Sequence, residues 1–400
     1  IRSQLDRWAA KDTRIKVVHR QENGHICHAT NSAFELASGA WIALLDHDDV
    51  LRPHALAEVA LALNEHPDAS LLYSDKDKID EKRARFSPHF KCDYSPELFH
   101  SMNYLNHLTV HRADLIRAVG GWRPGFEGSQ DYDLNLRITE KVDPASILHI
   151  PKILYHWRAV KGSTALAGSE KDYPFQAGFR ALEEHLQRTG QDAKVMEVPG
   201  LPFYRIRHAI RNPAPPVSLI LPTRDRIDLL RVAVQSILEK TDYPDYEIII
   251  VDNNSAEPET FAYFDEIGSH ENVRILPYPG AFNYSAINNE AVRHAEGEII
   301  GLINNDIEVI NGDWLSEMVS WAQQERVGCV GAKLYYPDDT IQHAGVILGI
   351  GGVASHAHKH KHRNDPGYFG RANVVQNYSA VTAACLLVRK SVFQAVGGLD

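Results

Sequence analysis

The chain has 400 residues, of which 44% are hydrophobic and 24% charged, and this length is sufficient for two domains that each bury a core. A formal net charge of -10 at pH 7 excludes a general nucleic-acid binder, because contacts to phosphates need a basic surface. The four cysteines include no CxxC pair, which fits a reducing compartment without a disulfide framework, and no run of 18 apolar residues predicts a transmembrane helix.

The first acidic motif follows an apolar run. Residues 14–51 are predicted to form a short strand, an amphipathic helix and a buried strand, and they end in ALLDHDDVL. Asp46 and Asp48 alternate along this extended segment, so both side chains can reach one site at the end of the strand. Crowded carboxylates repel one another unless a positive charge lies among them, and Mg²⁺ and Mn²⁺ take carboxylate oxygens together with ligand phosphates. We therefore expect a divalent metal here.

Further polar groups follow in the first half of the chain. The sequence YSDKDKID at 73–80 predicts a strand and a charged turn. GFEGSQDYDLNLR places Asp131 and Asp133 near the start of a helix, and IPKILYHWR places His156 after an apolar strand. With the preceding aspartates, these residues compose an acid–base and metal site. Two structural roles stay open, namely a helix cap for Asp131 and a packed core position for His156.

The join between the two halves is visible in the sequence. Residues 173–190 have helical periodicity and end on a glycine, and the prolines of RNPAPPVSL that follow suit a linker. We place the domain boundary so that the domains comprise residues 1–211 and 212–400. Strands and helices alternate in both halves, which predicts an α/β fold. In such sheets, ligands bind beyond the carboxyl ends of the strands.

Three predicted strands of the second half end in polar residues. These residues are Pro222 and Thr223 after the first strand, Asp252 after the second, and Asn304 with Asp306 after the third. No GxGxxG or GxxxxGK[ST] sequence follows the first strand, so the motif of a dinucleotide fold or a P-loop is absent. Acids and amides also open ordinary turns, so that role stays open for each strand end taken singly.

The two halves contain an internal repeat. Residues 14–51 resemble 272–310 at an offset of 258, and 110–122 resemble 387–399 at an offset of 277. The second copy therefore carries 19 additional residues between these blocks. Residues 217–255 have no counterpart in the first copy, and the first copy continues beyond the point at which the second ends. We expect a segment of a longer protein that lacks the start of the first unit and the end of the second.

The ordered motifs resemble glycosyltransferase family 2, the inverting nucleotide-sugar transferases of GT-A fold. The motifs that carry the resemblance are SLILPTRDR, EIIIVDNNS, FNYSAINN, LLDHDD, LINND, GFEGSQDYDLNLR and IPKILYHWR. More narrowly, the chain resembles tandem bacterial enzymes that build O-antigen and other surface polysaccharides. The resemblance implies two tandem GT-A domains with mixed, mostly parallel sheets. It implies that the first domain lacks its N-terminal nucleotide-binding strands and that the second lacks its catalytic-base segment. It also implies metal-dependent hexosyl transfer from a UDP- or dTDP-sugar to a glycan or lipid-linked glycan, in the cytoplasm at the inner face of the membrane.

For the first domain, the resemblance implies a role for each polar residue. Asp131 would be the general base, Asp46 would face the ribose of the sugar nucleotide, and Asp48 would bind Mg²⁺ or Mn²⁺ with His156. Gln130 stands where the family usually has a glutamate before the base, which removes one negative charge.

For the second domain, the resemblance implies the nucleotide pocket. Asp252 would hydrogen-bond the base, and Pro222 and Thr223 would line the same pocket. Asn304 takes the place of the first aspartate of the family's acidic motif on the nucleotide-sugar side, so Asp306 is the only carboxylate left there to bind metal.

Asp75, Asp77 and Trp122 are the predicted acceptor contacts, again by resemblance. Two other functions stay open. A sugar nucleotidyltransferase would need a glycine-rich, basic phosphate loop, and LPTRDRID lacks the glycines. A unit that binds nucleotide-sugar or glycan without turnover is kept open by Asn304 in place of an acid.

Overall fold

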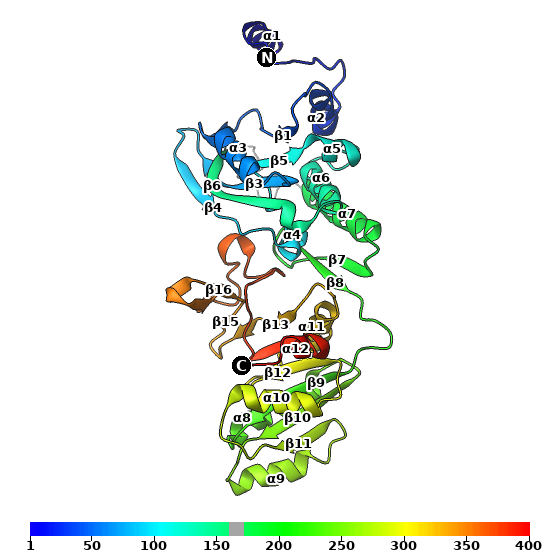
Figure 1. Cartoon of the computed structure of the whole chain (residues 1–400), viewed down its shortest axis with the longest axis vertical. Helices are drawn as coiled ribbons and strands as arrows, with labels where there is room; N and C mark the ends of the chain where they lie inside the picture. Colours follow the sequence, from blue (N-terminus) through cyan, green and yellow to red (C-terminus); the bar gives the residue numbers. More distant parts are fainter. Residues whose placement is uncertain (160–171) are drawn as a thin grey trace. The chain divides into compact units, whose positions relative to one another are not determined.

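A computed structural model of the chain describes residues 1–159 and 172–400. The chain divides into two compact units (Figure 1). The first consists of Ile1–Ile206 together with Phe369–Asn377, and the second of Arg207–Tyr368 and Tyr378–Asp400. The division at 206/207 lies close to the predicted boundary at 211/212, but the membership of 369–377 in the first unit was not expected.

The second unit is built on a six-stranded sheet. Its strand order is β11-β10-β9-β12-β18-β13, and neighbours from β11 to β12 pair in parallel, whereas β18 runs antiparallel to both β12 and β13. The strands are β9 (Val217–Thr223), β10 (Tyr246–Asp252), β11 (Val273–Pro277), β12 (Ile299–Ile303), β13 (Cys329–Gly331) and β18 (Cys385–Arg389). The parallel strands are continuous apolar runs, as expected for a sheet that is covered on both faces.

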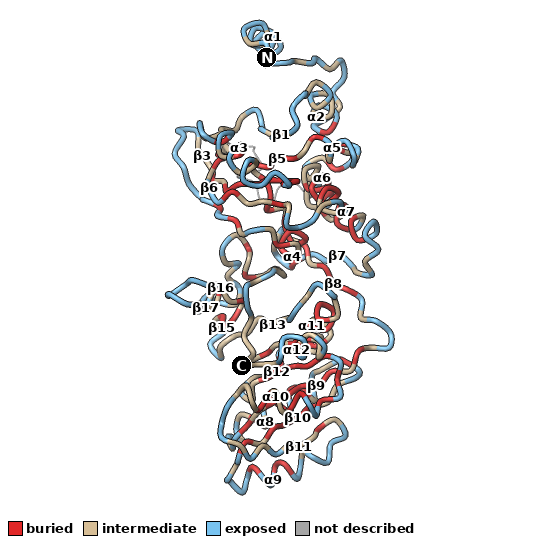
Figure 2. Tube along the Cα trace, viewed as in Figure 1, coloured by how far each residue is buried: buried red, intermediate tan, exposed pale blue. Residues whose placement is uncertain are grey.

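Helices cover both faces of this sheet. Ile248 and Ile250 of β10 pack in one buried cluster with Leu230 of α8. Ile249, between them in the strand, packs in a second buried cluster with Ile287 of α10. Alternate residues of a strand thus enter opposite cores, and Figure 2 shows these strands as buried. The helices are α8 (Ile227–Lys240), α9 (Pro258–Ile267), α10 (Tyr284–His294), α11 (Trp314–Ala322) and α12 (Lys390–Ala395).

The first unit also has a six-stranded sheet, with a different pairing. Its order is β1-β5-β3-β6-β2, with β4 paired to β3, and of these pairs only β3 and β6 are parallel. The strands are β1 (Trp41–Ala43), β2 (Val50–Leu51), β3 (Leu71–Ile79), β4 (Arg85–His89), β5 (Thr109–Arg112) and β6 (Ile147–Arg158). The expectation of mostly parallel sheets therefore holds for the second unit. In the first, antiparallel pairs dominate, because the first copy of the repeat contains counterparts of β12 and β18 but not of β9 and β10, and because the residues that match β11, 15–19, do not form the predicted strand.

The remaining elements complete the described chain. The helices of the first unit are α1 (Arg2–Lys11), α2 (His25–Glu35), α3 (Ala55–Glu65), α4 (Pro96–Ser101), α5 (Ala113–Ala118), α6 (Gln130–Thr139) and α7 (Asp172–Arg188). Short strands are β7 (Ala193–Glu197), β8 (Tyr204–His208), β14 (Leu334–Tyr335), β15 (Ile341–His343), β16 (Val346–Leu348) and β17 (Ala354–His356), and 3₁₀ turns span Pro144–Ser146, Ile350–Gly352 and Tyr368–Gly370. None of the described helices is long and apolar enough to cross a membrane.

The two copies of the repeat share a strand register. In the first unit, Ile42 of β1 lies opposite His111 of β5. In the second unit, Ile300 of β12 lies opposite Val388 of β18. These positions are related by the same offsets of 258 and 277 residues that relate the sequences.

An asparagine makes the same pair of hydrogen bonds in both copies. Asn31 of α2 donates from Nδ2 to the Trp122 carbonyl at 2.7 Å, and its Oδ1 accepts from the Trp122 N–H at 3.0 Å. Asn289 of α10 makes the equivalent bonds with Leu399, at 2.7 and 2.9 Å. We call this pairing the asparagine clamp.

The second glycine of each AVGG sequence is required by the clamp. Gly121 and Gly398 have φ angles of 70° and 82°. A Cβ atom at these positions would lie 2.6 and 2.5 Å from the clamp oxygen of Asn31 and Asn289, respectively. Only glycine tolerates both the left-handed backbone and this close approach, so AVGG is a packing turn.

The segment 369–377 is fixed to the first unit by hydrogen bonds. The Asn377 side-chain oxygen lies 2.8 Å from the Ser95 hydroxyl, and the Asn377 N–H donates to the same hydroxyl at 3.2 Å. Ser101 donates from its hydroxyl to the Val375 carbonyl at 3.1 Å. These contacts hold the segment beside α4.

Candidate functional site

The acidic segment between β1 and β2 is anchored to β6. The Asp49 carboxylate accepts hydrogen bonds from the Arg158 N–H at 2.7 Å and from the Tyr155 hydroxyl. Arg158 Nε donates to the Asp48 carbonyl at 2.5 Å, and the Asp46 N–H donates to the Tyr155 hydroxyl at 3.4 Å. The Asp49 carboxylate therefore anchors the acidic segment to β6. The carboxylates of Asp46 and Asp48 take no part in these hydrogen bonds.

These carboxylates lie in an environment of like charge. The pKa of Asp46 is raised, first because its carboxyl is partly withdrawn from water and then because Asp49 and Asp48 lie nearby. The Asp48 side chain is 39% exposed, and its Oδ1 lies 3.7 Å from His47 Nδ1. Across the described residues, no three His, Cys, Asp or Glu side chains gather as a metal-binding group. A cation here would thus be held by loop carboxylates together with ligand phosphates, a ligand set that suits Mg²⁺ or Mn²⁺.

His156, a predicted metal ligand, is paired with Asp77. Asp77 lies in β3 directly beside His156 of β6 and accepts from its Nδ1 and from Arg85 Nε, the latter at 2.5 Å. A carboxylate on one ring nitrogen fixes the tautomer of a histidine, and metal-bound histidines usually have such a partner. Asp77, predicted to contact the acceptor, is 2% exposed and engaged in these two pairs.

The other two predicted acceptor contacts are packed inside the first unit. Asp75 accepts from the Lys91 N–H at 2.8 Å and from His149 Nε2 at 2.9 Å. Trp122 is 2% exposed, and its ring packs edge-on against Phe34 at 5.8 Å. The ring of Trp122 therefore contributes to packing inside the first unit.

Asp131, the predicted base, lies at the second position of α6. Its Oδ1 accepts from the Tyr132 N–H at 2.8 Å. Withdrawal from water raises the pKa of Asp131 to about 6, with a further contribution from the Asp46 carboxylate, while the Tyr132 hydrogen bond and the Lys76 ammonium oppose the rise. A carboxyl group with a pKa close to neutrality is suited to general base catalysis. The fold therefore brings together the loop acid, the helix acid and a lysine of β3.

The neighbours of Asp131 stabilise the fold. Gln130 accepts from the Gly128 N–H at 2.8 Å and so stabilises the turn before α6. Asp133 is fully buried and is paired with Arg123 and with Arg137, the latter at 2.6 Å. Asp133 therefore has a structural role in these two ion pairs, and Asp131 is not part of them.

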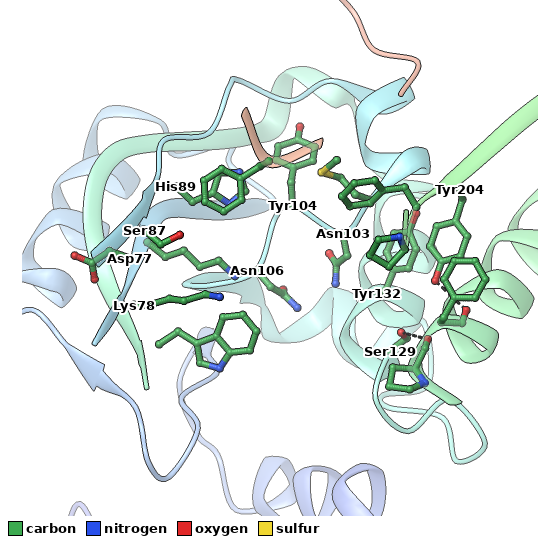
Figure 3. Close-up of a pocket in the computed structure, with 18 residues that line it drawn as sticks. Asp77, Lys78, Ser87, His89, Asn103, Tyr104, Asn106, Ser129, Tyr132 and Tyr204 are labelled. Atoms are coloured by element: carbon green, nitrogen blue, oxygen red, sulfur yellow. Dashed lines mark hydrogen bonds between the residues drawn. The ribbon is translucent and has the colours of Figure 1, made fainter. Parts of the chain in front are cut away.

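A pocket of about 480 Å³ opens beside the start of α6 (Figure 3). Ser129 and Tyr132, which flank Asp131 in the sequence, both line it. The remaining lining comes from β3, β4, β6, the segment after α4, the start of α7, the start of β8 with the residues before it, and Phe369. Lys76 and Lys78 of this pocket were not predicted from the sequence. They alternate with aspartates in DKDK, and this alternation indicates that the two lysines share one face of the strand, since alternate strand residues face opposite sides.

The second unit brings its predicted strand ends together. Thr223 ends β9 directly beside Asp252, which ends β10. Asn305, after β12, donates to the Thr223 hydroxyl at 3.0 Å, and Asp252 accepts from the Ser255 N–H at 3.0 Å. Pro222 precedes Thr223 in β9. The expected polar edge at the carboxyl ends of parallel strands is thus present.

The end of β12 contributes fewer side-chain contacts to this polar edge than expected of Asn304 and Asp306. The Asn304 N–H donates to the Ala384 carbonyl at 3.0 Å, and Asp306 is exposed in the turn that follows. Asn305, the polar residue between them, makes the side-chain contact to Thr223. Asp225 was not predicted from the sequence, and its carboxylate accepts from two successive N–H groups of the loop after β10 at 2.8 and 2.9 Å.

The family model described as Glycosyl transferase family 2 matches residues 1–117 and 218–397. The chain belongs to glycosyl transferase family 2. This confirms the resemblance of the motifs, and the strand pairing confirms the α/β class of GT-A glycosyltransferases with mixed sheets.

Known proteins similar to this family 2 chain include both curated relatives and solved structures. An uncharacterized protein, y4gI of Sinorhizobium fredii, is 52% identical over 99% of this chain and 44% of its own length. The O-antigen biosynthesis protein RfbC of Myxococcus xanthus is 42% identical over 98% of this chain and 30% of its own length. The chain thus spans less than half of these relatives. A solved mannosyltransferase, PcManGT of Pyrobaculum calidifontis in complex with GDP-Man and Mn²⁺, is 19% identical, with a TM-score of 0.36 over 46% of this chain and 48% of its own.

Proposed function

We propose that the chain is part of a metal-dependent, inverting glycosyltransferase of hexosyl type. It moves a sugar from a UDP- or dTDP-sugar to a glycan or lipid-linked glycan at the inner face of the cell membrane, during the synthesis of surface polysaccharide. The observation that carries the proposal is Asp131, a partly buried carboxyl with a pKa raised to about 6 that adjoins a pocket in a glycosyltransferase family chain.

In the first unit, Asp131 accepts the proton of the acceptor hydroxyl as the hydroxyl oxygen attacks the anomeric carbon. The bond from that carbon to the nucleoside diphosphate lies on the opposite face of the sugar and breaks during this attack. The single displacement inverts the anomeric configuration without an enzyme-bound intermediate. Asp46 binds the ribose of the donor. Asp48 and His156 would hold Mg²⁺ or Mn²⁺, which supplies positive charge against the diphosphate.

In the second unit, Asp252 hydrogen-bonds the nucleotide base beside Pro222 and Thr223. Asn304 and Asp306 lie on the sugar-diphosphate side, where Asp306 binds the metal. The position of Thr223 and Asp252 at one sheet edge supports this assignment. The shared strand registers and the two asparagine clamps support two tandem copies of one glycosyltransferase unit.

A second function, nucleotide-sugar binding without turnover, is favoured for the second unit by one observation. Asn304 supplies an amide where the first unit has Asp46, so one carboxylate of the motif is missing. Under this alternative, the second unit retains donor affinity but releases no nucleoside diphosphate.

The experiment that tests the main proposal measures release of nucleoside diphosphate by the full-length protein with a panel of UDP- and dTDP-sugars. Asp131→Asn should lower kcat of the first unit by about 10²–10⁴-fold, the usual contribution of a general base. Asp68→Asn, a change at an exposed aspartate, is the matched control. If Asp131→Asn left the rate within about twofold of the wild type, the assignment of the base would be wrong.

A further inference from the structure

Two asparagines of the pocket beside Asp131 lie in the segment that follows α4. Asn103 and Asn106 both line the pocket, and in Figure 3 their amide groups are directed toward its open middle. Asn103 Oδ1 is buried, yet among the described residues it has no hydrogen-bond partner. Leaving a buried acceptor unpaired is costly, so such an atom in the wall of a pocket indicates a ligand that donates a hydrogen bond to it.

A buried hydrogen-bond network fixes the orientation of Asn106. Its Oδ1 lies 2.9 Å from the Thr109 hydroxyl and 3.4 Å from Asn135 Nδ2. The Asn135 oxygen in turn lies 2.7 Å from His111 Nε2. These four side chains belong to residues that are at most 6% exposed. Because the Asn106 oxygen is engaged by this network, its Nδ2 donor group is the part left to meet a ligand.

The same network places Asn106 near the predicted base. Asn135 and Asp131 both belong to α6, four residues apart, so they lie one turn apart on the same face of the helix. Ser129 and Tyr132, which flank Asp131, also line the pocket. A ligand that bonds to Asn106 is thus held close to Asp131.

The charged side chains of the lining have interactions of their own. The Lys76 ammonium interacts with the carboxylates of Asp131 and Asp49. Lys78 lies against an aromatic ring, with its ammonium nitrogen 5.4 Å from the centre of the ring. Asp77 forms ion pairs with two basic side chains. The two amides are therefore the groups best placed to recognise a ligand, and they are uncharged.

Aromatic rings supply much of the remaining wall. Phe175 and Tyr204 stack with 4.9 Å between their ring centres, and both line the pocket together with Tyr104 and Tyr132. The volume of about 480 Å³ lies within the range of small-molecule sites, about 300–1,000 Å³. Flat apolar rings beside a few uncharged polar groups suit a hexose, which has apolar C–H faces and an edge of hydroxyl groups.

We propose that this pocket binds an uncharged hexose unit of the acceptor. One of its hydroxyl groups donates to Asn103 Oδ1, and the oxygen of a neighbouring hydroxyl accepts from Asn106 Nδ2. The inference rests on the proposed transferase function and names the class of its acceptor. A hydroxyl group both donates and accepts, so two adjacent hydroxyls match the carbonyl and the NH₂ group that the asparagines present. An analogue without the first hydroxyl leaves the Asn103 oxygen unpaired, so the site discriminates against it.

The test measures binding of sugars to the full-length protein by titration calorimetry without any donor. The first probes are the methyl glycosides of glucose, galactose and mannose in both anomeric forms, and the second are the monodeoxy derivatives of the glycoside that binds most tightly. We expect one monodeoxy derivative to bind about five- to 100-fold more weakly than its parent, as a buried acceptor left unpaired would give.

Variants of Asn103 assign this discrimination. Asn103→Leu should weaken binding of the parent glycoside and bind the parent and the deoxy derivative equally within about twofold, whereas Asn103→Asp, which keeps an acceptor oxygen, should retain the discrimination. Asn64→Leu, at an exposed position of α3, is the matched control. Because Asn103 Oδ1 has no partner in the described part of the chain, Asn103→Leu should unfold at a urea concentration no lower than that of the wild type.

Three outcomes overturn the inference. The first is that none of the hexosides binds, or that all deoxy derivatives bind as tightly as the parent. The second is discrimination that survives in Asn103→Leu. The third is binding of methyl β-D-glucuronide more than about tenfold tighter than methyl β-D-glucoside, which would make the ligand acidic. Since binding is measured without turnover, each of these results leaves the transferase proposal to its own test.

Discussion

The carboxyl group of Asp131 is subject to opposing influences that determine when it can accept a proton. Withdrawal from water and the Asp46 carboxylate favour its neutral form, and the Tyr132 N–H and the Lys76 ammonium favour its charged form. The result is a carboxyl group whose pKa of about 6 lies well above the ordinary aspartate value.

The first prediction at this scale concerns pH. Because the deprotonated carboxyl is the base, kcat should be constant well above pH 6 and fall as the pH drops through about 6, by about tenfold per unit below that point. Lys76→Met removes the cation that favours the carboxylate, so the inflection should move to higher pH. The pH dependence of kcat measures both. An inflection near pH 4 in the wild type would show that Asp131 titrates as an ordinary aspartate.

The second prediction concerns the metal. Chelation with EDTA should lower the transfer rate by at least about 100-fold, since a Lewis acid contributes several kcal/mol against developing charge, and Mn²⁺ or Mg²⁺ should restore it. Asp48→Asn should raise the metal concentration needed for half-maximal rate, and Asp68→Asn should not change it. A transfer rate that is insensitive to the chelator would contradict the metal assignment.

At the scale of elements, the asparagine clamp joins a helix to the glycine turn that follows α5 in the first unit and α12 in the second. In the second unit, α10 is tied through Asn289 to the backbone of Leu399, which follows α12. Both hydrogen bonds go to one residue, so loss of the side chain leaves an N–H and a carbonyl group without their partner.

Asn289→Ala should therefore lower the free energy of unfolding of the second unit by about 1–3 kcal/mol, the cost of partly buried groups left unpaired. Urea denaturation, followed by a probe in that unit, measures the change. Asn364→Ala, at an exposed loop position, is the control and should have an effect close to zero. Equal unfolding curves for the two variants would show that the clamp does not stabilise the unit.

Elements also show what the sequence could predict. The polar edge of the second unit was predictable, because parallel strands that end in Thr223 and Asp252 must place those ends side by side. In the first unit, the face of β3 that lines the pocket was not predictable from the sequence. DKDK predicts alternation, but the face with Lys76 could be recognised as the pocket side only when β4 supplied Arg85 as the partner of Asp77. The burial of Trp122 beside Phe34 was not predictable either, because these two residues lie far apart in the sequence and meet only through the fold.

At the scale of the whole chain, the first unit includes a segment from the far end of the sequence. Phe369 stacks on His89 with a ring distance of 3.9 Å and lines the pocket. The repeat could not predict this, because the 19 residues added in the second copy have no counterpart from which a position could be inferred. The pocket beside α6 is therefore completed by residues that the repeat does not supply.

If this pocket receives the acceptor of the proposed reaction, Phe369→Ala should raise the KM for the acceptor by about two- to tenfold, since aromatic pairs contribute about 0.5–1.5 kcal/mol. The KM for the donor and kcat should not change, because the ring lies on the pocket side and not at the acidic loop. Phe261→Ala, on the exposed side of α9, is the control. Initial rates over a matrix of donor and acceptor concentrations separate these effects, and a change confined to the donor KM would contradict the assignment.

The placement of 369–377 has a consequence for biosynthesis. A ribosome makes the acidic loop and Asp131 early, but it makes Phe369 and the Asn377 that anchors this segment only after more than 150 further residues of the second unit. Domains ordinarily fold as units while the chain is still being synthesised, but the first unit lacks one of its segments until most of the second has been made. A nascent or prematurely terminated chain would carry the acidic loop and Asp131 without the segment that completes the pocket. Completion of the first unit is thereby tied to translation of most of the second.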